Sequence, residues 1–220
     1  MIERTLEPEV MDAPNEAIEY DLMDHSSANH SFIADLLGGG SVGPNVLDLG
    51  TGTAEIPVLL CDQTDDCRVV AVDASVSMLE IARHKVIESG HETRIQLDHS
   101  DVKTFQWNDE LFHTVISNSL IHHLPAPAAF LPLLPPLLQP GGRLFIRDLA
   151  RPDSEATVEK LVTTYAGDET EFSQQLFRQS LIAALTADEM RDIVSQIGLD
   201  PQSVQMTSDR HWTCDAVLPR

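Results

Sequence analysis

The sequence is poor in basic residues. It holds 14 Lys and Arg against 35 Asp and Glu, which gives a formal net charge of −21. A surface this acidic repels nucleic-acid backbones and anionic lipid head groups, so the composition disfavours large polyanionic partners. We therefore expect neither nucleic acid nor a membrane among the partners.

Cysteine is also scarce. Cys61, Cys67 and Cys214 are odd in number and form no paired motif, which is typical of a reduced, intracellular protein. Long apolar runs are missing too: none could span a membrane, and the first residues, MIERTLEPEV, lack the apolar core of a signal peptide. The expected location is the cytoplasm. A length of 220 residues favours a single domain with a full core.

What the sequence does contain is a regular alternation of strand-like and helix-like segments. One helix pattern is bounded by Ser75 as its N-cap and Gly90 as its terminator. Strands this apolar, separated by helices, indicate a doubly wound α/β fold whose mostly parallel sheet is covered on both faces. The five strands expected in this part span residues 45–50, 68–74, 94–101, 113–119 and 141–150.

The alternation changes after the fifth strand. Residues 153–184 have the pattern of two helices, and a further helix begins with Thr186 and Glu189 as a capping box. Residues 203–218 are expected to form an antiparallel hairpin, which completes a seven-stranded sheet. The single domain 1–220 then divides into an N-terminal helical cover (1–40), a core (45–150), a helical lid insertion (151–185) and a last helix with the hairpin (186–220).

The segment between the fourth and fifth strands, LPAPAAFLPLLPPLLQPGG, carries six prolines. Prolines inside a helix remove backbone hydrogen bonds, so we expect a short or kinked helix here. Five of its apolar residues are expected to be buried: Phe130, Leu133, Leu134, Leu137 and Leu138.

A glycine turn in NVLDLGTGTAEIPVLL, residues 45–60, joins the first strand to a helix. A dinucleotide site would use G-x-G-x-x-G and place its pyrophosphate at the start of the helix. Here the third glycine is missing, Glu55 stands in its place, and Asp48 lies just before the turn. Two carboxylates are unfavourable beside a phosphate and suit a ligand that carries positive charge.

With these residues the chain resembles the class I S-adenosylmethionine-dependent methyltransferases. VLDLGTGTA resembles their glycine-rich first motif, with Ala54 in place of the usual last glycine. VVAVDAS, HSDV and VISNSLIHHL resemble the segments at the ends of their second, third and fourth strands, and LLQPGGRLFIRD resembles the turn into the fifth. The VISNSLIHHL segment is most similar to the small-molecule branch related to ubiquinone-type methyltransferases.

The resemblance implies S-adenosylmethionine as the cofactor, bound by the 45–150 core, and S-adenosylhomocysteine as the product. This cofactor has an ammonium, a sulfonium and a ribose diol but no phosphate, in agreement with the acidic turn. Asp48 would then favour the ammonium, Asp73 would accept hydrogen bonds from the ribose hydroxyls, and Asp101 with Val102 would contact the adenine. The cofactor-binding residues implied in this way are Asp48, Gly50, Thr51, Gly52, Asp73, Ala74, Met78, Asp101, Val102, Asn118 and Ser119.

His122 and His123 follow the fourth strand, at the carboxyl edge where ligands bind in open α/β sheets. One or both could orient or deprotonate a methyl acceptor, or the pair could only pack the loop; both interpretations stay open. Because no H-x-x-x-H or carboxylate–histidine set accompanies the adjacent pair, we expect no metal site.

Two segments are expected to form the substrate pocket: a covering helix within residues 16–37 and the lid at 153–184. The two arginines near the fifth strand's end could engage an anionic acceptor, or they could pair with local acids such as Asp148 and Asp153. The residues expected to contact the acceptor are Tyr20, Arg147, Arg151 and Tyr165.

The expected function is therefore methyl transfer from S-adenosylmethionine, in line, to a small-molecule acceptor by a monomer or homodimer. Two alternatives stay open. One is a NAD-dependent oxidoreductase of Rossmann type, disfavoured by Glu55 and the missing third glycine. The other is a protein that binds S-adenosylmethionine without catalysis.

Overall fold

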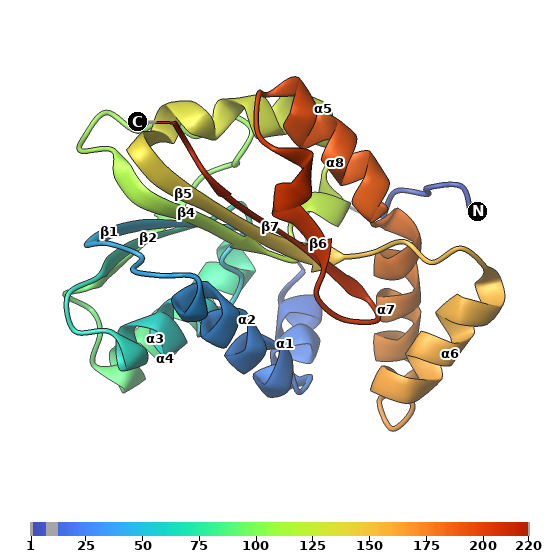
Figure 1. Ribbon diagram of the computed structural model, residues 1–220. Coiled ribbons are helices and arrows are strands. Elements are labelled where there is room, and N and C mark those ends of the chain that lie inside the picture. The colour runs from blue at the N-terminus through green and yellow to red at the C-terminus, as the bar shows by residue number, and fades with distance from the viewer. Residues whose placement is uncertain (1, 8–12, 220) are drawn as a thin grey trace.

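The computed structural model describes residues 2–7 and 13–219. In this part of the chain, seven strands form one sheet in the order β3-β2-β1-β4-β5-β7-β6 (Figure 1). The first five strands run parallel, and β7 pairs antiparallel with both β5 and β6. The predicted doubly wound α/β fold with its C-terminal hairpin is confirmed. The strands are β1 (Asn45–Leu49), β2 (Arg68–Asp73), β3 (Ile95–His99), β4 (Phe112–Asn118), β5 (Leu138–Leu149), β6 (Val204–Met206) and β7 (His211–Val217).

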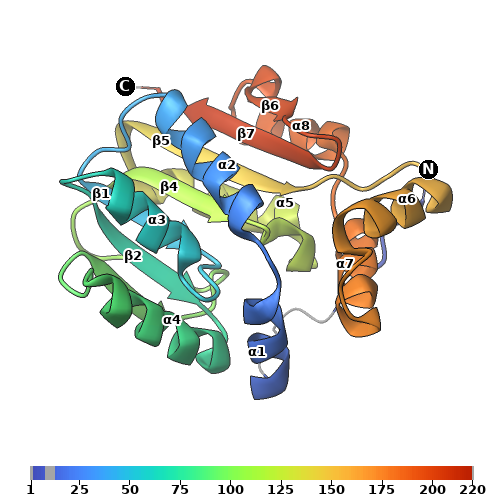
Figure 2. The same cartoon turned by 90° about the horizontal axis from the view of Figure 1, so that it is seen from below.

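Helices cover both faces of this sheet. On one face lie α2, α3 and α4 (Figure 2), and their buried residues pack with the sheet into one apolar cluster. The opposite face is covered by α5 and α8, whose apolar residues belong to a second cluster. The helices are α1 (Pro14–Leu22), α2 (Ser26–Gly38), α3 (Glu55–Gln63), α4 (Val76–Ser89), α5 (Pro127–Phe130), α6 (Glu155–Ala166), α7 (Glu171–Ala183) and α8 (Ala187–Gln196). Within the described ranges, none of the helices is long and apolar enough to cross a membrane.

The predicted helix signals act as expected. Ser75 caps α4 by accepting a hydrogen bond from the backbone N–H of Met78 at 3.1 Å, and Gly90 ends the helix with φ +73°. Thr186 and Glu189 form the predicted capping box at the start of α8. These local signals place both ends of α4 and the start of α8 where the sequence indicates them.

The insertion after β5 forms the two predicted helices, α6 and α7, which pack on each other beyond the end of the sheet (Figure 1). They share a small apolar cluster that includes Leu149, Val158 and Leu181. Their position brings α6 and α7 to the same end of the sheet as the carboxyl ends of β1 and β4.

Two expectations need correction. The cover expected as one helix within residues 16–37 is two helices, α1 and α2, because the backbone is extended at Met23 and Asp24 accepts a hydrogen bond from the backbone N–H of Ser26. In the proline-rich segment, Leu133 is 45% exposed rather than buried. Short helical turns follow α5 here, and an i, i+3 repeat puts Leu131 and Leu134 on the core side and Leu133 outside.

Candidate active site

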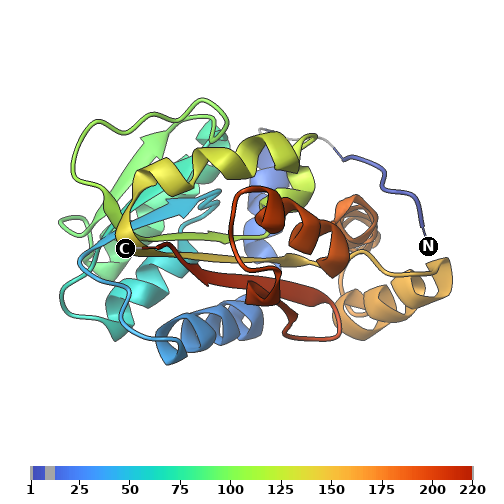
Figure 3. The same ribbon diagram turned by 45° about the horizontal axis from the view of Figure 1, so that its top comes forward.

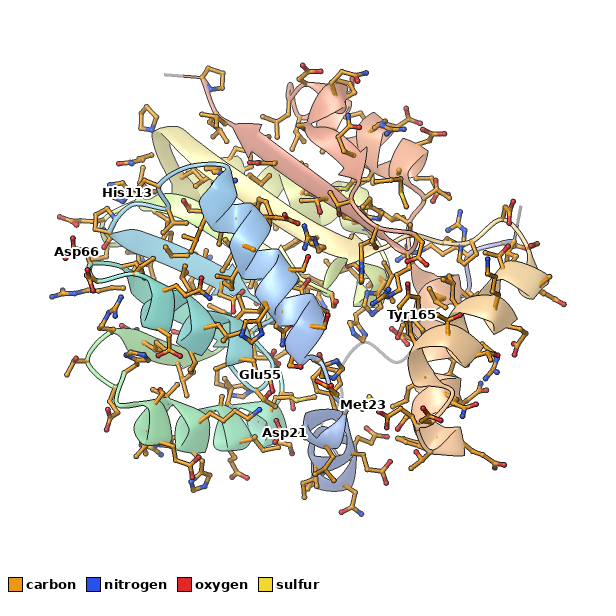
Figure 4. The ribbon with its side chains drawn as sticks, turned by 60° about the horizontal axis from the view of Figure 1, so that its bottom comes forward. Asp21, Met23, Glu55, Asp66, His113 and Tyr165 are labelled. Atoms are coloured by element: carbon orange, nitrogen blue, oxygen red, sulfur yellow. The ribbon has the colours of Figure 1, made fainter. Side chains whose placement is uncertain are left out.

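A cleft of about 490 Å³ lies at the carboxyl ends of β1 and β4. These neighbouring strands lie where the strand order turns, since β1 is followed outward by β2 and β4 by β5. Open α/β sheets bind ligands at such a point. One wall of the cleft comes from the α1–α2 region and the other from α6, α7 and the β6–β7 turn. Figure 4 labels Met23 on the first wall and Tyr165 on the second.

The glycine turn forms the floor of this cleft. Gly50 has φ +72°, and a Cβ there would lie 2.9 Å from Leu120, so this position requires glycine. At Gly52, with φ +55°, a Cβ would meet nothing within 4 Å, because the residue faces open space. Ala54 takes the left-handed conformation as well, with φ 61°, where the resemblance expects a glycine. Such strained residues gather at ligand sites.

Asp73 supports the turn from the end of β2. Its carboxylate accepts a hydrogen bond from the backbone N–H of Gly52 at 2.8 Å and another from that of Ser75 at 2.8 Å. Burial raises the pKa of Asp73, and these two N–H groups partly offset the effect. The carboxylate lines the cleft with acceptor capacity remaining on both oxygens.

Asp48 is the most unusual group in the cleft. Its side chain is buried, with 2% of the residue exposed, and its Oδ2 has no hydrogen-bond partner among the described residues. Burial raises the pKa of Asp48 to about 7; the neighbouring Thr51 hydroxyl offsets part of this rise, and the nearby Asp73 adds to it. A buried carboxylate oxygen without a donor is costly, so the site favours a ligand that brings a donor or a positive charge.

Glu55 has a different role from the one that the sequence suggests. Its Oε1 lies 2.7 Å from the Lys85 ammonium and its Oε2 accepts a hydrogen bond from Asn29 at 2.5 Å. Lys85 also pairs with Asp21, which ties α1 to α4. Because Lys85 and Asn29 engage both oxygens of Glu55, the carboxylates that remain available beside the turn are those of Asp48 and Asp73. The sequence contains no local signal for this pairing, since Lys85 lies on another helix.

The histidine pair lies where β4 ends. His122 is buried; its Nδ1 lies 2.5 Å from Oδ1 of Asp148, and its backbone N–H donates to Oδ2 of the same residue at 3.1 Å. Burial alone would lower the pKa of His122, but Asp148 and Glu7 outweigh it and raise the pKa. The pairing with His122 lowers the pKa of the buried Asp148.

Glu7 joins the pair from the N-terminal segment. Its Oε1 lies 3.3 Å from Nε2 of His122 and 3.1 Å from Nδ1 of His123. Arg4 holds this segment in place by donating to the backbone carbonyls of Ala183 at 2.6 Å and Leu124 at 2.9 Å. Figure 3 shows the N-terminal residues near α7. Sequence reasoning missed Glu7, because no motif surrounds it and the contact joins residues about half the chain length apart.

The two arginines expected to contact an acceptor have internal partners. Arg147 donates to the Thr213 hydroxyl at 2.8 Å and to Asp35 at 2.5 Å, and it lines the cleft. Arg151 pairs with Glu189 at 2.5 Å and is absent from the lining of the cleft. Neither arginine forms its ion pair with Asp148 or Asp153, the local acids considered from the sequence.

Tyr165 links the lid to the hairpin. Its hydroxyl donates to Asp209 at 2.8 Å, and the Arg210 guanidinium lies 3.4 Å from its ring centroid. Tyr20 lies on the opposite wall, with its ring centroid 4.5 Å from that of His25. Both tyrosines line the cleft.

The structure thus brings most of the predicted residues together. Four of them are not part of the cleft lining: Ala74, Asp101, Val102 and Arg151. Asp101 pairs with Lys103 at 3.2 Å and Val102 lies in the core. The predicted residues that do line the cleft are Tyr20, Asp48, Gly50, Thr51, Gly52, Asp73, Met78, Asn118, Ser119, His122, His123, Arg147 and Tyr165.

Comparison with known families agrees with this geometry. Residues 41–198 match the family described as "Methyltransferase domain". The chain belongs to this family. The match confirms the resemblance stated from the sequence motifs, and this methyltransferase-family chain extends beyond the matched residues at both ends.

Individual relatives share only part of their length with the chain. It is 24% identical over 167 residues to 27-O-demethylrifamycin SV methyltransferase of Amycolatopsis mediterranei, covering 76% of this chain and 57% of that protein. It is also 24% identical over 178 residues to a ubiquinone/menaquinone biosynthesis C-methyltransferase of Coxiella burnetii, covering 79% and 68% of the two chains. Among solved structures, the plantazolicin methyltransferase BamL, in complex with a triazolic desmethylPZN analog and SAH, matches with a TM-score of 0.70 at 14% identity. That match covers 94% of this chain and 92% of BamL.

Proposed function

We propose that this protein transfers the methyl group of S-adenosylmethionine to a small-molecule acceptor. The observation that carries the proposal is the unpartnered, buried Oδ2 of Asp48 beside the glycine turn. The cofactor's ammonium would supply the missing donor and stabilise the ionised carboxylate. A pyrophosphate at the same place would face a buried negative charge, which disfavours a dinucleotide.

The rest of the cofactor fits the groups around Asp48. The backbone N–H groups at the start of α3 are suited to its carboxylate. The acceptor capacity left on Asp73 is suited to the ribose hydroxyls. The remaining proposed contacts are Gly50, Thr51, Gly52, Ala74, Met78, Asn118 and Ser119, with Asp101 and Val102 proposed at the adenine.

We place the acceptor between the histidine pair and the lid. His122 and His123 line the cleft where an acceptor atom would approach the methyl group, and we propose them as the residues that contact and activate it. Tyr20, Arg147 and Tyr165 line the surrounding walls. Alignment behind the S–CH3 bond supplies much of the acceleration of such a transfer. We therefore propose a positioning role for the walls.

A small acceptor is favoured over a macromolecule. The net charge of −21 disfavours nucleic acid and anionic membranes. The names of the two relatives described above refer to small molecules, methylated on oxygen in one case and on carbon in the other. We propose a cytoplasmic protein that acts as a monomer or homodimer.

Cofactor binding is tested first. Calorimetry and thermal shift should detect S-adenosylhomocysteine but not NADH, and binding should stabilise the fold by mass action on the native state. Absence of any S-adenosylhomocysteine binding at millimolar concentration contradicts the proposal.

Catalysis is tested by a screen of small hydroxyl, amine and carbon acceptors with methyl-labelled cofactor. Label transfer to a small molecule is the expected result. Robust transfer to tRNA or duplex DNA instead would refute the proposed acceptor class.

A further inference from the structure

Three side chains at the acceptor end of the cleft converge on one point. Glu7, His122 and His123 each offer a ligand atom, and these atoms all lie within 4.8 Å of one another. The Glu7 and His122 side chains are 5% and 4% exposed, and that of His123 is 18% exposed, so the point is enclosed but reachable from the cleft. The sequence-based expectation of no metal site considered the adjacent histidines without Glu7.

The two separations that involve the Glu7 oxygen match those of ligands on a shared metal ion. Metal bonds to histidine nitrogen and carboxylate oxygen of about 2.1 Å place neighbouring ligand atoms about 3.0 Å apart in an octahedron and about 3.4 Å apart in a tetrahedron. The Glu7 oxygen lies 3.1 Å from Nδ1 of His123 and 3.3 Å from Nε2 of His122. Both values fall between the two limits. A single cation bound by all three side chains would place one carboxylate oxygen opposite two ring nitrogens in this way.

The partner of His122 strengthens this assignment. Its Nδ1 lies 2.5 Å from Oδ1 of Asp148, which is 1% exposed. When Nδ1 carries the proton donated to Asp148, Nε2 presents a lone pair towards Glu7. A metal-bound histidine commonly donates its other ring N–H to a carboxylate in this way, and the bond fixes the ring's orientation and tautomer.

Charge balance points in the same direction. Glu7 and Asp148 are two buried carboxylates within one cluster of four side chains. Buried charges need compensation, and the Arg4 guanidinium, which donates to the backbone carbonyl of His122 at 3.2 Å, supplies one positive charge. A divalent ion bound at Nε2 of His122, Nδ1 of His123 and Glu7 would compensate both carboxylates with the histidines neutral.

We propose that Glu7, His122 and His123 form a three-ligand site for a divalent first-row transition ion, with Asp148 as the carboxylate that orients His122. Two imidazoles and one carboxylate suit Zn²⁺, Fe²⁺ or Mn²⁺. Among the described residues three side chains offer ligand atoms, and a bound ion would then have coordination positions left for another ligand. Metal binding stands independently of the proposed function. The role of the open positions in holding an acceptor oxygen or nitrogen rests on that function.

Metal binding is measured on the untagged full chain after chelator treatment and dialysis. Titration with Co²⁺ should produce visible d–d absorption, and added Zn²⁺ should displace it at one ion per chain. Elemental analysis after gel filtration gives the stoichiometry directly. A wild-type chain that retains no ion and shows no Co²⁺ spectrum overturns the proposal.

Variants test the ligands. Glu7→Gln and His123→Asn should each weaken Zn²⁺ binding by more than about 10-fold, and Asp148→Asn by about 10–100-fold through the orientation of His122. The matched controls are Glu3→Gln, in the same N-terminal segment, and His84→Asn, on the exposed face of α4. Both controls should bind Zn²⁺ as wild type does. Equal affinity in wild type, Glu7→Gln and His123→Asn would show that the ion sits elsewhere and refute the site.

Binding of S-adenosylhomocysteine separates this inference from the proposed function. Glu7→Gln lies in the N-terminal segment and should retain cofactor binding, which also shows that the variant folds. Loss of Zn²⁺ binding with intact cofactor binding is the expected result. A wild-type chain that binds Zn²⁺ but not S-adenosylhomocysteine would refute the proposed function and leave the metal site standing.

Discussion

Asp48→Asn should stabilise the free protein and weaken its cofactor binding. The substitution keeps the shape of a side chain that is 2% exposed and removes its charge. In the folded chain burial raises the pKa of Asp48 from 3.8 to about 7. Because the folded-state pKa is raised, the carboxyl's contribution to stability is fully present below pH 4 and is lost as the pH rises through 7.

The size of the effect follows from that shift. Three pKa units correspond to about 4 kcal/mol, at 1.36 kcal/mol for each unit, which is an upper limit for the cost of ionising Asp48 in the free protein. We expect Asp48→Asn to recover about 1–4 kcal/mol at pH 8 and close to nothing at pH 4. For a chain of this size, each kcal/mol raises Tm by about 2–4 °C.

Cofactor binding should change in the opposite direction. In the wild type, the affinity for S-adenosylhomocysteine should increase as the pH rises through about 7, the pKa of Asp48, because the ionised carboxylate meets the ammonium. Asn should remove that pH dependence and cost about 1.5–3 kcal/mol of binding at pH 8. Calorimetry from pH 5.5 to 8.5 measures both effects.

The control is Asp66→Asn, an exposed carboxyl at the end of the sheet away from the cleft (Figure 4), which should change neither quantity. An Asp48→Asn protein that is less stable than wild type at pH 8 would contradict the burial argument. Unchanged affinity for S-adenosylhomocysteine would place the ammonium elsewhere.

Three further results are expected. Asp73→Ala should weaken S-adenosylhomocysteine binding by about 1.5–3 kcal/mol for each lost hydrogen bond to the carboxylate. If calorimetry gives the wild-type affinity instead, Asp73 does not bind the ribose. Gly50→Ala and Gly52→Ala should both lose stability in urea denaturation from the left-handed backbone, about 1–2 kcal/mol each. Gly50→Ala should lose about 1 kcal/mol more of unfolding free energy than Gly52→Ala, because its new methyl group would press on the Leu120 side chain. Equal losses in the two variants would contradict this contact. Thr186→Ala should lower the unfolding free energy by about 0.5–2 kcal/mol while Thr186→Ser retains it, because the hydroxyl caps α8; identical losses would refute the cap.

The fold could be predicted well from the sequence, because the signals that determine its helices and strands are local. Apolar periodicity, the Ser75 cap and the Thr186–Glu189 capping box act over a few residues, and each is present in the structure. The glycine turn and Asp73 were also accessible, since parallel strands bring their carboxyl ends to one edge.

The missed features depend on contacts between distant segments. Lys85 pairs with Glu55 from another helix, and Glu7 contacts the histidines from about half the chain length away. Arg151 pairs with Glu189 on α8 rather than with a neighbour in sequence. Periodicity carries no information about such pairings, because any of several acids would satisfy an arginine or lysine equally well.

Because Arg4 anchors the N-terminal segment beside the cleft, truncated fragments of this protein need to include that segment. Arg4 and Glu7 lie outside the family match at residues 41–198, as do α1, α2 and β7. A fragment cut at the limits of that match would lose one wall of the cleft, the strand that flanks β5, and the carboxylate that faces both histidines. Its inactivity would then say nothing about the chemistry of the intact chain. An N-terminal fusion partner poses a milder form of the same problem, because it would be attached within a few residues of the acceptor end of the cleft.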